Sequence, residues 1–215
     1  MKILICAATA TEIEKVQKLL SINYPPVEFL ITGVGTPFTM YRLLSHLQNS
    51  KPQLVINIGI AGAYSKDLKI GHVYLVQSDS FADLGIETQD NFIHLSETKM
   101  WTEHDIFNKN KIICENSYFE HFSKYYQTIN ALTFNTCHGN QTSINQLLKN
   151  YSADIETMEG AAIAYICKKQ KIPYLQIRSI SNYVEQRDVN KWNIPLAIEN
   201  LTNEIIHIMD ELIHS

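Results

Sequence analysis

Two carboxylates, Glu12 and Glu159, stand where a short apolar run gives way to a helical pattern. A carboxylate in such a place can activate water or accept hydrogen bonds from sugar hydroxyls. It can also be purely structural, because the helix dipole stabilises acidic side chains in the first turn. Glu159 lies in an unusual string, 156–162, in which three small residues follow it and leave an open floor beside the carboxylate. Both residues are therefore candidates for catalysis or sugar binding.

Asn182 and two glycine-containing segments are the other candidates. Asn182 ends a predicted strand, where an asparagine either forms a turn or presents its amide to a ligand. The segments 33–35 and 59–62 either bring the backbone close to a sugar or base, or are tight strand-to-helix turns. Neither is a phosphate loop, because the first lacks the third glycine of a dinucleotide fingerprint and no Gly-Lys-Ser/Thr follows the second.

The elements that must position these residues alternate between strand and helix. The predicted strands are residues 2–7, 27–32, 54–58, 72–77, 131–136, 155–157 and 174–180. The predicted helices are residues 11–20, 37–48, 143–149, 159–170 and 192–214. This alternation predicts an α/β fold, a three-layer sandwich with a mostly parallel central sheet. A capping box of Thr11 and Glu14 is expected to start the first helix, and residues 79–110 break the pattern as a long functional loop.

Ligands of such a sheet bind at the carboxyl ends of its strands. This rule selects five places, each after a predicted strand: residues 8–12, 33–35, 59–62, 158–159 and 181–182. The candidates named above all lie in these places.

The composition limits the class of protein. The 215 residues are 45% apolar and 19% charged, which is typical of a single globular domain, here 1–215. A net charge of −4 argues against nucleic-acid binding, because no large cationic surface is available. No apolar run approaches the roughly 18 residues of a membrane span. The chain enters a strand pattern at once, without a secretory signal pattern, so we expect a cytoplasmic protein.

The cysteines do not predict a metal site. Four are present, far apart in the sequence and without a CxxC pair: Cys6, Cys114, Cys137 and Cys167. We therefore expect reduced, buried thiols rather than structural zinc or a disulfide scaffold.

At this point the chain resembles the purine nucleoside phosphorylase/hydrolase superfamily, in its nucleosidase branch, over nearly its whole length. The resemblance rests on the first strand with Glu12 after it and on segments 59–62, 157–162 and 178–182. The Met158-Glu159 pair with its small residues is the most specific of these motifs. Within the branch, segments 81–85 and 181–187 are similar to the futalosine hydrolases, which remove hypoxanthine from futalosine in the alternative menaquinone pathway.

The resemblance implies a nucleoside phosphorylase-like fold and hydrolysis of an N-glycosidic bond through an oxocarbenium-like sugar, as in glycoside hydrolysis. It implies that Glu12 activates water, that Glu159 accepts from the ribose hydroxyls and that Met158 packs on the sugar. It implies further substrate-binding residues, namely Ile60, Ala61, Gly62 and Ser181. It also implies a small-molecule nucleoside substrate and no metal or organic cofactor. Finally, it implies a homodimer or larger homo-oligomer in which segment 79–91 contributes residues to the pocket of a neighbouring subunit.

Asn182 departs from the adenine-specific nucleosidases of this branch, which carry Asp there to protonate N7 of the leaving base. An amide cannot be a general acid at neutral pH. Its NH₂ can donate to O6 or N7 of a 6-oxopurine, and its carbonyl can accept from a ring N–H. Asn182 therefore favours hypoxanthine over adenine.

Water rather than phosphate is the expected nucleophile. Phosphorylases of the superfamily hold phosphate with arginines, one of them in the loop after the first strand. Here that loop, 6–12, has no Arg or Lys, and a phosphate dianion beside Glu12 without a cation would be poorly stabilised.

Two alternatives stay open at this stage. One is a nucleosidase acting on methylthioadenosine, S-adenosylhomocysteine or aminodeoxyfutalosine. The other is a catalytically silent nucleoside-binding protein, although binding alone does not require both Glu12 and Glu159. For the benzoate-type end of futalosine the candidates are Arg187, Arg42, Phe38, Phe81 and Tyr183, each of which can equally be a surface or core residue. Trp192 is expected to pack against the last helix rather than touch a ligand.

Overall fold

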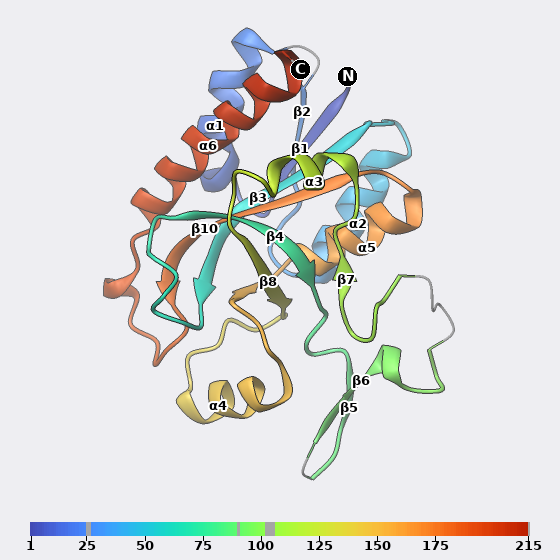
Figure 1. The fold of residues 1–215 in the computed structure, drawn as a ribbon, viewed down its shortest axis with the longest axis vertical. Helices are drawn as coiled ribbons and strands as arrows, with labels where there is room; N and C mark the ends of the chain where they lie inside the picture. The colour runs from blue at the N-terminus through green and yellow to red at the C-terminus, as the bar shows by residue number, and fades with distance from the viewer. Residues whose placement is uncertain (25–26, 90, 102–105, 215) are drawn as a thin grey trace.

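The computed structural model describes residues 1–24, 27–89, 91–101 and 106–214. Its two longest strands, β3 (Leu54–Ala63) and β10 (Tyr174–Tyr183), pair in parallel at the centre of an eight-stranded sheet. β1 (Ile3–Ala7) pairs in parallel with β3, and β2 (Val27–Ile31) pairs in parallel with β1. This half of the sheet carries the first candidate segments (Figure 1).

β3 and β10 also belong to a closed ring of strands. Its other members are β4 (Val73–Asp79), β8 (Thr128–Thr133) and β9 (Ile155–Thr157). β10 pairs with β4 and β9 pairs with β3 in antiparallel fashion, whereas β4 with β8 and β8 with β9 are parallel. β7 (Ile112–Ile113) pairs with β4, again antiparallel. The sheet is therefore mixed, and the ring strands enclose one buried apolar cluster.

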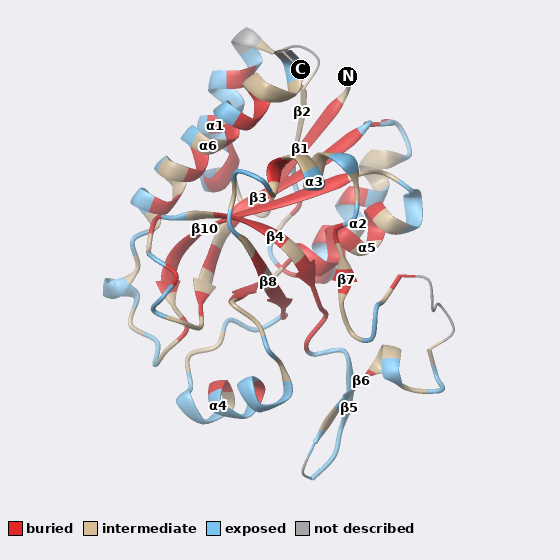
Figure 2. Ribbon diagram, in the orientation of Figure 1, coloured by how far each residue is buried: buried red, intermediate tan, exposed pale blue. Residues whose placement is uncertain are grey.

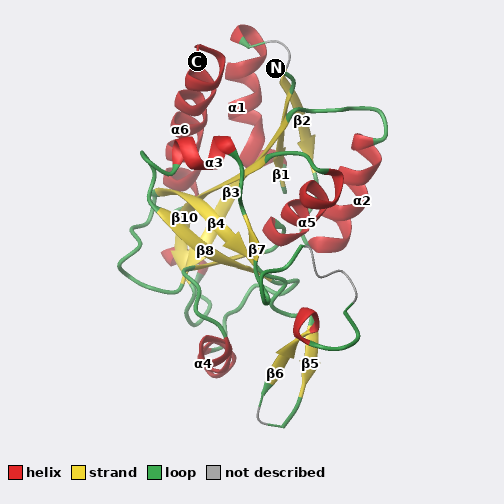
Figure 3. Ribbon diagram, turned by 45° about the vertical axis from the view of Figure 1, so that its right-hand side comes forward, coloured by secondary structure: helices red, strands yellow, loops and turns green. Residues whose placement is uncertain are grey.

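Helices cover both faces of the sheet. α1 (Ala10–Asn23) and α6 (Ile194–His214) pack on one face, and α2 (Thr36–Leu47) and α5 (Gly160–Gln170) pack on the other (Figures 1 and 3). Successive side chains of a strand point to opposite faces, so the odd-numbered and even-numbered apolar residues of β1 enter different clusters. Burial on both faces explains why the central strands are continuous apolar runs (Figure 2).

Several elements were not predicted from the sequence. They are the helix α3 (Ser117–Phe122), the hairpin strands β5 (Gly85–Glu87) and β6 (Phe92–His94), the short strand β7, and two 3₁₀ turns, Leu95–Glu97 and Val189–Lys191. The hairpin projects away from the sheet (Figure 3). The long loop predicted over 79–110 thus contains local structure, although residues 90 and 102–105 of that segment lie outside the described part. The helix α4 (Gln141–Asn150) agrees with its prediction.

Two local predictions were wrong. The capping box of the first helix is formed by Thr9 and Glu12, not by Thr11 and Glu14, so the helix begins earlier. Residues 59–62 do not end the third strand, because β3 continues to Ala63 in extended conformation. In the described residues, the glycines with positive φ are Gly33, Gly35 and Gly71, so segment 59–62 needs small residues for space and not for a turn.

None of the helices in the described ranges is both long and apolar enough to cross a membrane.

Candidate active site

A cavity of about 440 Å³ collects all eight residues that the sequence predicted for the site. They are Glu12, Ile60, Ala61, Gly62, Met158, Glu159, Ser181 and Asn182. They come from the start of α1, the end of β3, the junction of β9 with α5, and the end of β10. A second cavity of about 330 Å³ has Asn182 in its wall as well. The tertiary structure therefore brings the five predicted places together.

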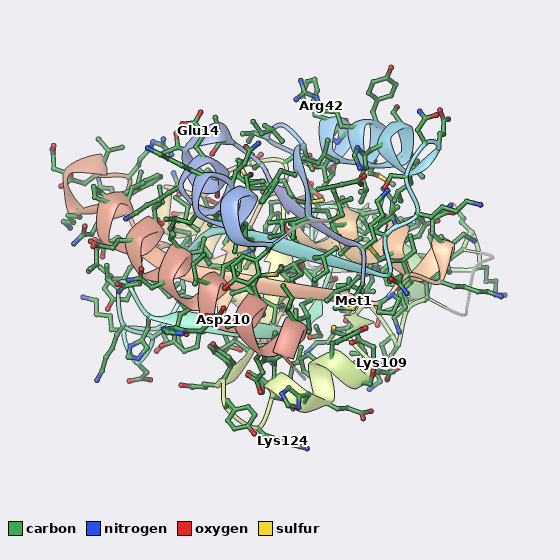
Figure 4. All side chains as sticks on the ribbon, turned by 90° about the horizontal axis from the view of Figure 1, so that it is seen from above. Met1, Glu14, Arg42, Lys109, Lys124 and Asp210 are labelled. Atoms are coloured by element: carbon green, nitrogen blue, oxygen red, sulfur yellow. The ribbon has the colours of Figure 1, made fainter. Side chains whose placement is uncertain are left out.

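The Glu12 carboxylate is held by three donors. Its Oε2 accepts from the Thr9 backbone N–H at 3.0 Å and from the Thr9 hydroxyl at 2.8 Å, and its Oε1 accepts from the Ile60 N–H at 3.0 Å. Only 8% of the residue is exposed. Glu12 thus serves as the capping residue of α1 and as a fixed acceptor in the cavity wall, so the structural and the functional interpretation of this carboxylate apply together. Glu14, two residues on, is exposed at the surface (Figure 4).

Glu159 lies at the N-terminus of α5 and reaches the glycine segment 33–35. Its Oε1 accepts from the Gly35 N–H at 2.9 Å. Gly35 has φ of +92°, a conformation that side chains with a Cβ rarely adopt. The glycine turn therefore has a specific task, which is to present a backbone donor to this carboxylate. Burial raises the pKa of Glu159, while the Gly35 N–H and the charge of Arg178 act in the opposite direction.

Arg178 is the main site residue that the sequence analysis left without a role. It is buried on β10, and a Cβ placed on Gly59 would lie 2.2 Å from Nη1 of Arg178 and 2.8 Å from Oε1 of Glu12. The guanidinium and this carboxylate therefore meet beside Gly59. The Nε and Nη2 atoms of Arg178 have no hydrogen-bond partner among the described residues. Burial lowers the pKa of Arg178, and the charges of Glu159, Glu12 and Asp79 oppose that shift.

Arg178 corrects one premise of the sequence analysis. The loop 6–12 carries no cation, but β10 supplies one beside Glu12 from a distant part of the chain. The signal in the sequence was a charged residue inside a predicted strand, because a charge buried in a central strand is costly unless it is compensated.

The buried Asp79 carboxylate supports the start of α5. Its Oδ1 accepts from Ser80 N–H at 2.8 Å and from the Thr133 hydroxyl at 2.9 Å, and its Oδ2 accepts from Gln176 Nε2 at 2.9 Å. A Cβ on Gly160 would lie 2.1 Å from Asp79 Oδ2. Gly160, the first small residue after Glu159, is therefore required because Asp79 packs closely against it, and not because a ligand needs open space there. Burial raises the pKa of Asp79 to about 6.

Asn182 has a defined amide orientation. Its Oδ1 accepts from the Ser181 hydroxyl at 2.7 Å, and its Nδ2 donates to the Tyr183 carbonyl at 3.0 Å. Because a backbone carbonyl can only accept, the bond to Tyr183 fixes which end of the amide carries the NH₂ group. The second N–H of Nδ2 is available to a ligand.

The candidates for the benzoate end separate into two groups. Arg187 lines both cavities and Tyr183 lines the smaller one. The other three lie elsewhere: Phe81 is buried in the core, and Phe38 is exposed on α2. Arg42 is also exposed on α2 (Figure 4).

Trp192 was expected to pack against the last helix rather than to touch a ligand, and the structure places it at the cavity wall. It precedes α6, lines both cavities, and its ring centre lies 5.1 Å from Cζ of Arg187. Cation–π stacking of this kind places an aromatic face and a guanidinium together at the wall of the site.

Glu156 and His138 were also missed. Both line the larger cavity, and His138 Nδ1 lies 2.5 Å from Glu156 Oε2. The hydrogen bond to Glu156 raises the pKa of His138. Glu156 stood in the quoted string 156–162, but its pairing partner is far away in the sequence, so no local pattern identified it. No group of three or more His, Cys, Asp or Glu side chains placed to hold a metal ion occurs in the part of the chain that the structure describes.

Comparisons with known proteins agree with this geometry. A family model described as the phosphorylase superfamily matches residues 21–213. A futalosine hydrolase from Acidothermus cellulolyticus is 28% identical over 81% of this chain and 71% of its own length. A 5′-methylthioadenosine/S-adenosylhomocysteine nucleosidase from Buchnera aphidicola subsp. Baizongia pistaciae is 28% identical over 84% of this chain and 72% of its own length.

Solved structures show the same fold. The crystal structure of the Helicobacter pylori 5′-methylthioadenosine/S-adenosylhomocysteine nucleosidase with butyl-thio-DADMe-Immucillin-A superposes with a TM-score of 0.81 at 18% identity, covering 98% of each chain. A futalosine hydrolase mutant of H. pylori strain 26695 gives a TM-score of 0.81 at 18% identity, covering 98% of this chain and 99% of that one. At this identity the likeness concerns the fold.

Proposed function

This chain belongs to the phosphorylase superfamily, and we propose from that membership and the site that it hydrolyses the N-glycosidic bond of futalosine, releasing hypoxanthine and dehypoxanthine futalosine. Relatives named futalosine hydrolase from three organisms support this substrate. The observation that carries the proposal is an amide, Asn182, in one cavity with two buried carboxylates, Glu12 and Glu159. The carboxylates provide for hydrolysis, and the amide suits a 6-oxopurine.

In this proposal Glu12 is the base that orients and deprotonates the attacking water. Three donors fix its carboxylate and leave it acceptor capacity toward the cavity. Breaking the bond between C1′ and the purine nitrogen leaves positive charge on the sugar ring, and buried carboxylates stabilise such charge strongly in a site that excludes water. Glu159 accepts from the ribose hydroxyls, and Met158 packs on the sugar.

Asn182 and Ser181 hold the leaving base. The free N–H of Asn182 Nδ2 donates to N7 or O6 as electron density moves into the purine ring. This donation stabilises the base as it departs as an anion, since an amide cannot transfer a proton. The departed base then takes up a proton from solvent to give hypoxanthine, and Glu12 releases to solvent the proton that it took from the attacking water. Ile60, Ala61 and Gly62 also line the cavity that would hold the nucleoside.

Water remains the proposed nucleophile despite the buried cation. Arg178 is influenced by three carboxylates, Glu12, Glu159 and Asp79, so its single positive charge is already compensated within the protein. A phosphate dianion would add two negative charges to that group. Arg178 is better suited to orient the water molecule and Glu12 than to hold phosphate.

A second candidate function is hydrolysis of methylthioadenosine or S-adenosylhomocysteine. It is favoured by a relative of that name whose sequence identity, 28%, equals that of the Acidothermus cellulolyticus futalosine hydrolase. Aminodeoxyfutalosine belongs with it, because its base is adenine. The amide at position 182 speaks against all three substrates. A silent binding protein is disfavoured by the two buried carboxylates in the cavity.

We further propose that residues 1–215 form one domain that acts in the cytoplasm as a homodimer or larger homo-oligomer. Its ligand is a nucleoside, and it binds neither nucleic acid nor a membrane. Exposed apolar side chains on and before α2, among them Val34, Phe38 and Tyr41, support self-association. We also propose that segment 79–91 lends residues to a neighbour's cavity; its hairpin exposes Ile86 and Ile93. Light scattering on the purified chain measures the oligomeric state.

The experiment that tests the proposed function is a product assay on futalosine, inosine and methylthioadenosine, with and without phosphate. Free hypoxanthine from futalosine, released at the same rate in both buffers, is the expected result. Adenine released faster from methylthioadenosine would move the protein to the second candidate. A sugar 1-phosphate in stoichiometric amounts would make it a phosphorylase.

A further inference from the structure

The helix α2 begins at the glycine turn that holds Glu159, and two side chains from distant parts of the chain accept its first backbone donors. The Gly35 N–H donates to Glu159 Oε1 at 2.9 Å, and the next N–H, that of Thr36, donates to Asn135 Oδ1 at 3.0 Å. Gly35 is the N-cap residue of α2 and has no side chain that could accept from this helix end. Asn135, two residues after β8, therefore supplies the cap instead.

Asn135 fixes the backbone on one side of Gly35, while Glu159 is bonded on the other side. Its Oδ1 also accepts from the Thr36 hydroxyl at 2.8 Å, and a Cβ placed on Gly35 would lie 3.4 Å from the same oxygen. Glycine is the residue with the greatest conformational freedom, so the direction of the Gly35 N–H has to be fixed by the groups around it. The position of Asn135 therefore bears on the position of the Glu159 carboxylate.

Asp83 orients the amide of Asn135. Its Oδ2 accepts from the Asn135 backbone N–H at 2.9 Å and from Asn135 Nδ2 at 3.1 Å. Because an ionised carboxylate only accepts, the NH₂ group of Asn135 faces Asp83 and the amide oxygen is left for Thr36. Both side chains belong to exposed residues, and neither is among the described residues that line the two cavities. They can therefore influence a bound nucleoside only through other residues.

We propose that Asn135 is a positioning residue for Glu159. It acts through Thr36 and Gly35, and Asp83 holds its amide in the required orientation. The bonds run from the loop after β4, through the loop after β8 and the start of α2, to the carboxylate at the start of α5. This inference rests on the proposed function, because that function gives Glu159 its role at the ribose hydroxyls.

The first test is Asn135→Ala in steady-state kinetics on futalosine. Both kcat and KM should change in the same direction as in Glu159→Gln, and kcat/KM should fall by roughly 2- to 30-fold, which is the cost of a lost helix cap converted to a rate ratio. Asn116→Ala is the matched control, because Asn116 caps α3 and bonds the Tyr174 carbonyl at the end of β10 away from the site. It should lower stability but leave kcat and KM unchanged.

A double-mutant cycle separates positioning of Glu159 from a general loss of structure. In the Glu159→Ala protein, Asn135→Ala should cause no further loss of kcat/KM, because no carboxylate remains to be positioned. In the Glu12→Gln protein the same substitution should cause its full loss, because Glu12 lies outside this series of bonds. A purely structural role of Asn135 would give the same loss in both proteins.

An exchange of the two side chains provides a rescue. Asn135→Asp keeps an oxygen for Thr36 but places a second carboxylate against Asp83, so it should lower kcat/KM at least as much as Asn135→Ala. Adding Asp83→Asn to that protein again pairs an amide with a carboxylate, with the two positions exchanged. The doubly exchanged protein should recover kcat/KM to within roughly 2-fold of the unmodified protein.

The inference is overturned if Asn135→Ala leaves kcat and KM unchanged, if its loss persists in the Glu159→Ala protein, or if the double exchange restores nothing. Cleavage of methylthioadenosine instead of futalosine would remove only the proposed substrate, because the same variants can be measured on that ribonucleoside. If the protein cleaves no nucleoside, the proposed function fails, and calorimetry with inosine and 2′,3′-dideoxyinosine tests Asn135 separately. Asn135→Ala should then reduce the preference for inosine, and an unchanged preference would overturn the inference.

Discussion

The two sides of the cavity are built on different physical principles. The side around Glu12, Glu159 and Arg178 is a cluster of buried charges, each compensated by another or by backbone donors. The side around Asn182 and Gly62 is a row of hydrogen-bonding groups in strand register. Buried charges act strongly on a charge that develops during a reaction. Oriented neutral groups act on the difference between two similar ligands. The first side should therefore determine the rate, and the second the choice of base.

The largest expected effect is that of Glu12→Gln. Loss of the general base should lower kcat on futalosine by roughly 100-fold or more, with nucleoside binding retained. Glu14→Gln is the matched control, since Glu14 lies exposed on the same helix. Steady-state kinetics on both variants checks this. A kcat for Glu12→Gln close to that of the unmodified protein would contradict the assignment of the base.

Glu159→Gln should affect binding as well as rate. Its carboxylate is proposed to accept from the ribose hydroxyls and to stabilise the cationic sugar, so both KM and kcat should change, kcat by roughly 10-fold or more. The measurement is the KM-against-kcat split relative to Glu12→Gln. If Glu159→Gln altered neither KM nor kcat, Glu159 would have only a structural role in the charge cluster.

Asn182→Asp tests the second side of the cavity, around Asn182 and Gly62. The ratio of kcat/KM for futalosine over aminodeoxyfutalosine should fall by roughly 5- to 150-fold, the range for one mismatched polar contact of about 1–3 kcal/mol. A carboxyl can accept from the 6-amino group and, if burial raises its pKa, can protonate N7. An unchanged ratio would mean that Asn182 does not determine base selectivity. The two sides of the cavity would then not have the separate roles proposed for them.

The smallest effect concerns Asp79, which lies beneath the charge cluster and outside the cavity wall. Its pKa is raised from 3.8 to about 6 in the folded protein by burial. The folded state therefore binds more protons than the unfolded state between these values, so stability falls as pH rises from about 4 to 6. The difference corresponds to about 3 kcal/mol as an order of magnitude.

Asp79→Asn should remove this pH dependence, because the amide does not titrate. Thermal or denaturant unfolding at pH 4, 5 and 6 measures it, with the unmodified protein as reference. If the slope of stability against pH is the same in both proteins, the Asp79 carboxyl titrates alike in the folded and unfolded chains. Asp79 would then not help to support the charge cluster.

The strand and helix pattern was largely readable from local sequence. Central strands such as 3–7 and 54–58 are buried on both faces and so appear as largely apolar runs. Shorter elements were missed for the opposite reason. β5 and β6 form an exposed hairpin of three residues each, and β7 has two residues, so little apolar periodicity marks them.

The sequence by itself determined which residues stand at the ends of strands, and therefore that Glu12, Glu159 and Asn182 would converge at one edge of the sheet. Their types, taken with the family resemblance, already indicated hydrolysis and a preference for a 6-oxopurine. Only the tertiary structure decided that Arg178 would meet Glu12 beside Gly59, and that Asn182, Gly62 and Glu156 would lie in one row. The physical reason is register: β9 and β10 follow β3 by roughly a hundred residues in the chain, and no local pattern specifies which residues of distant strands lie opposite one another.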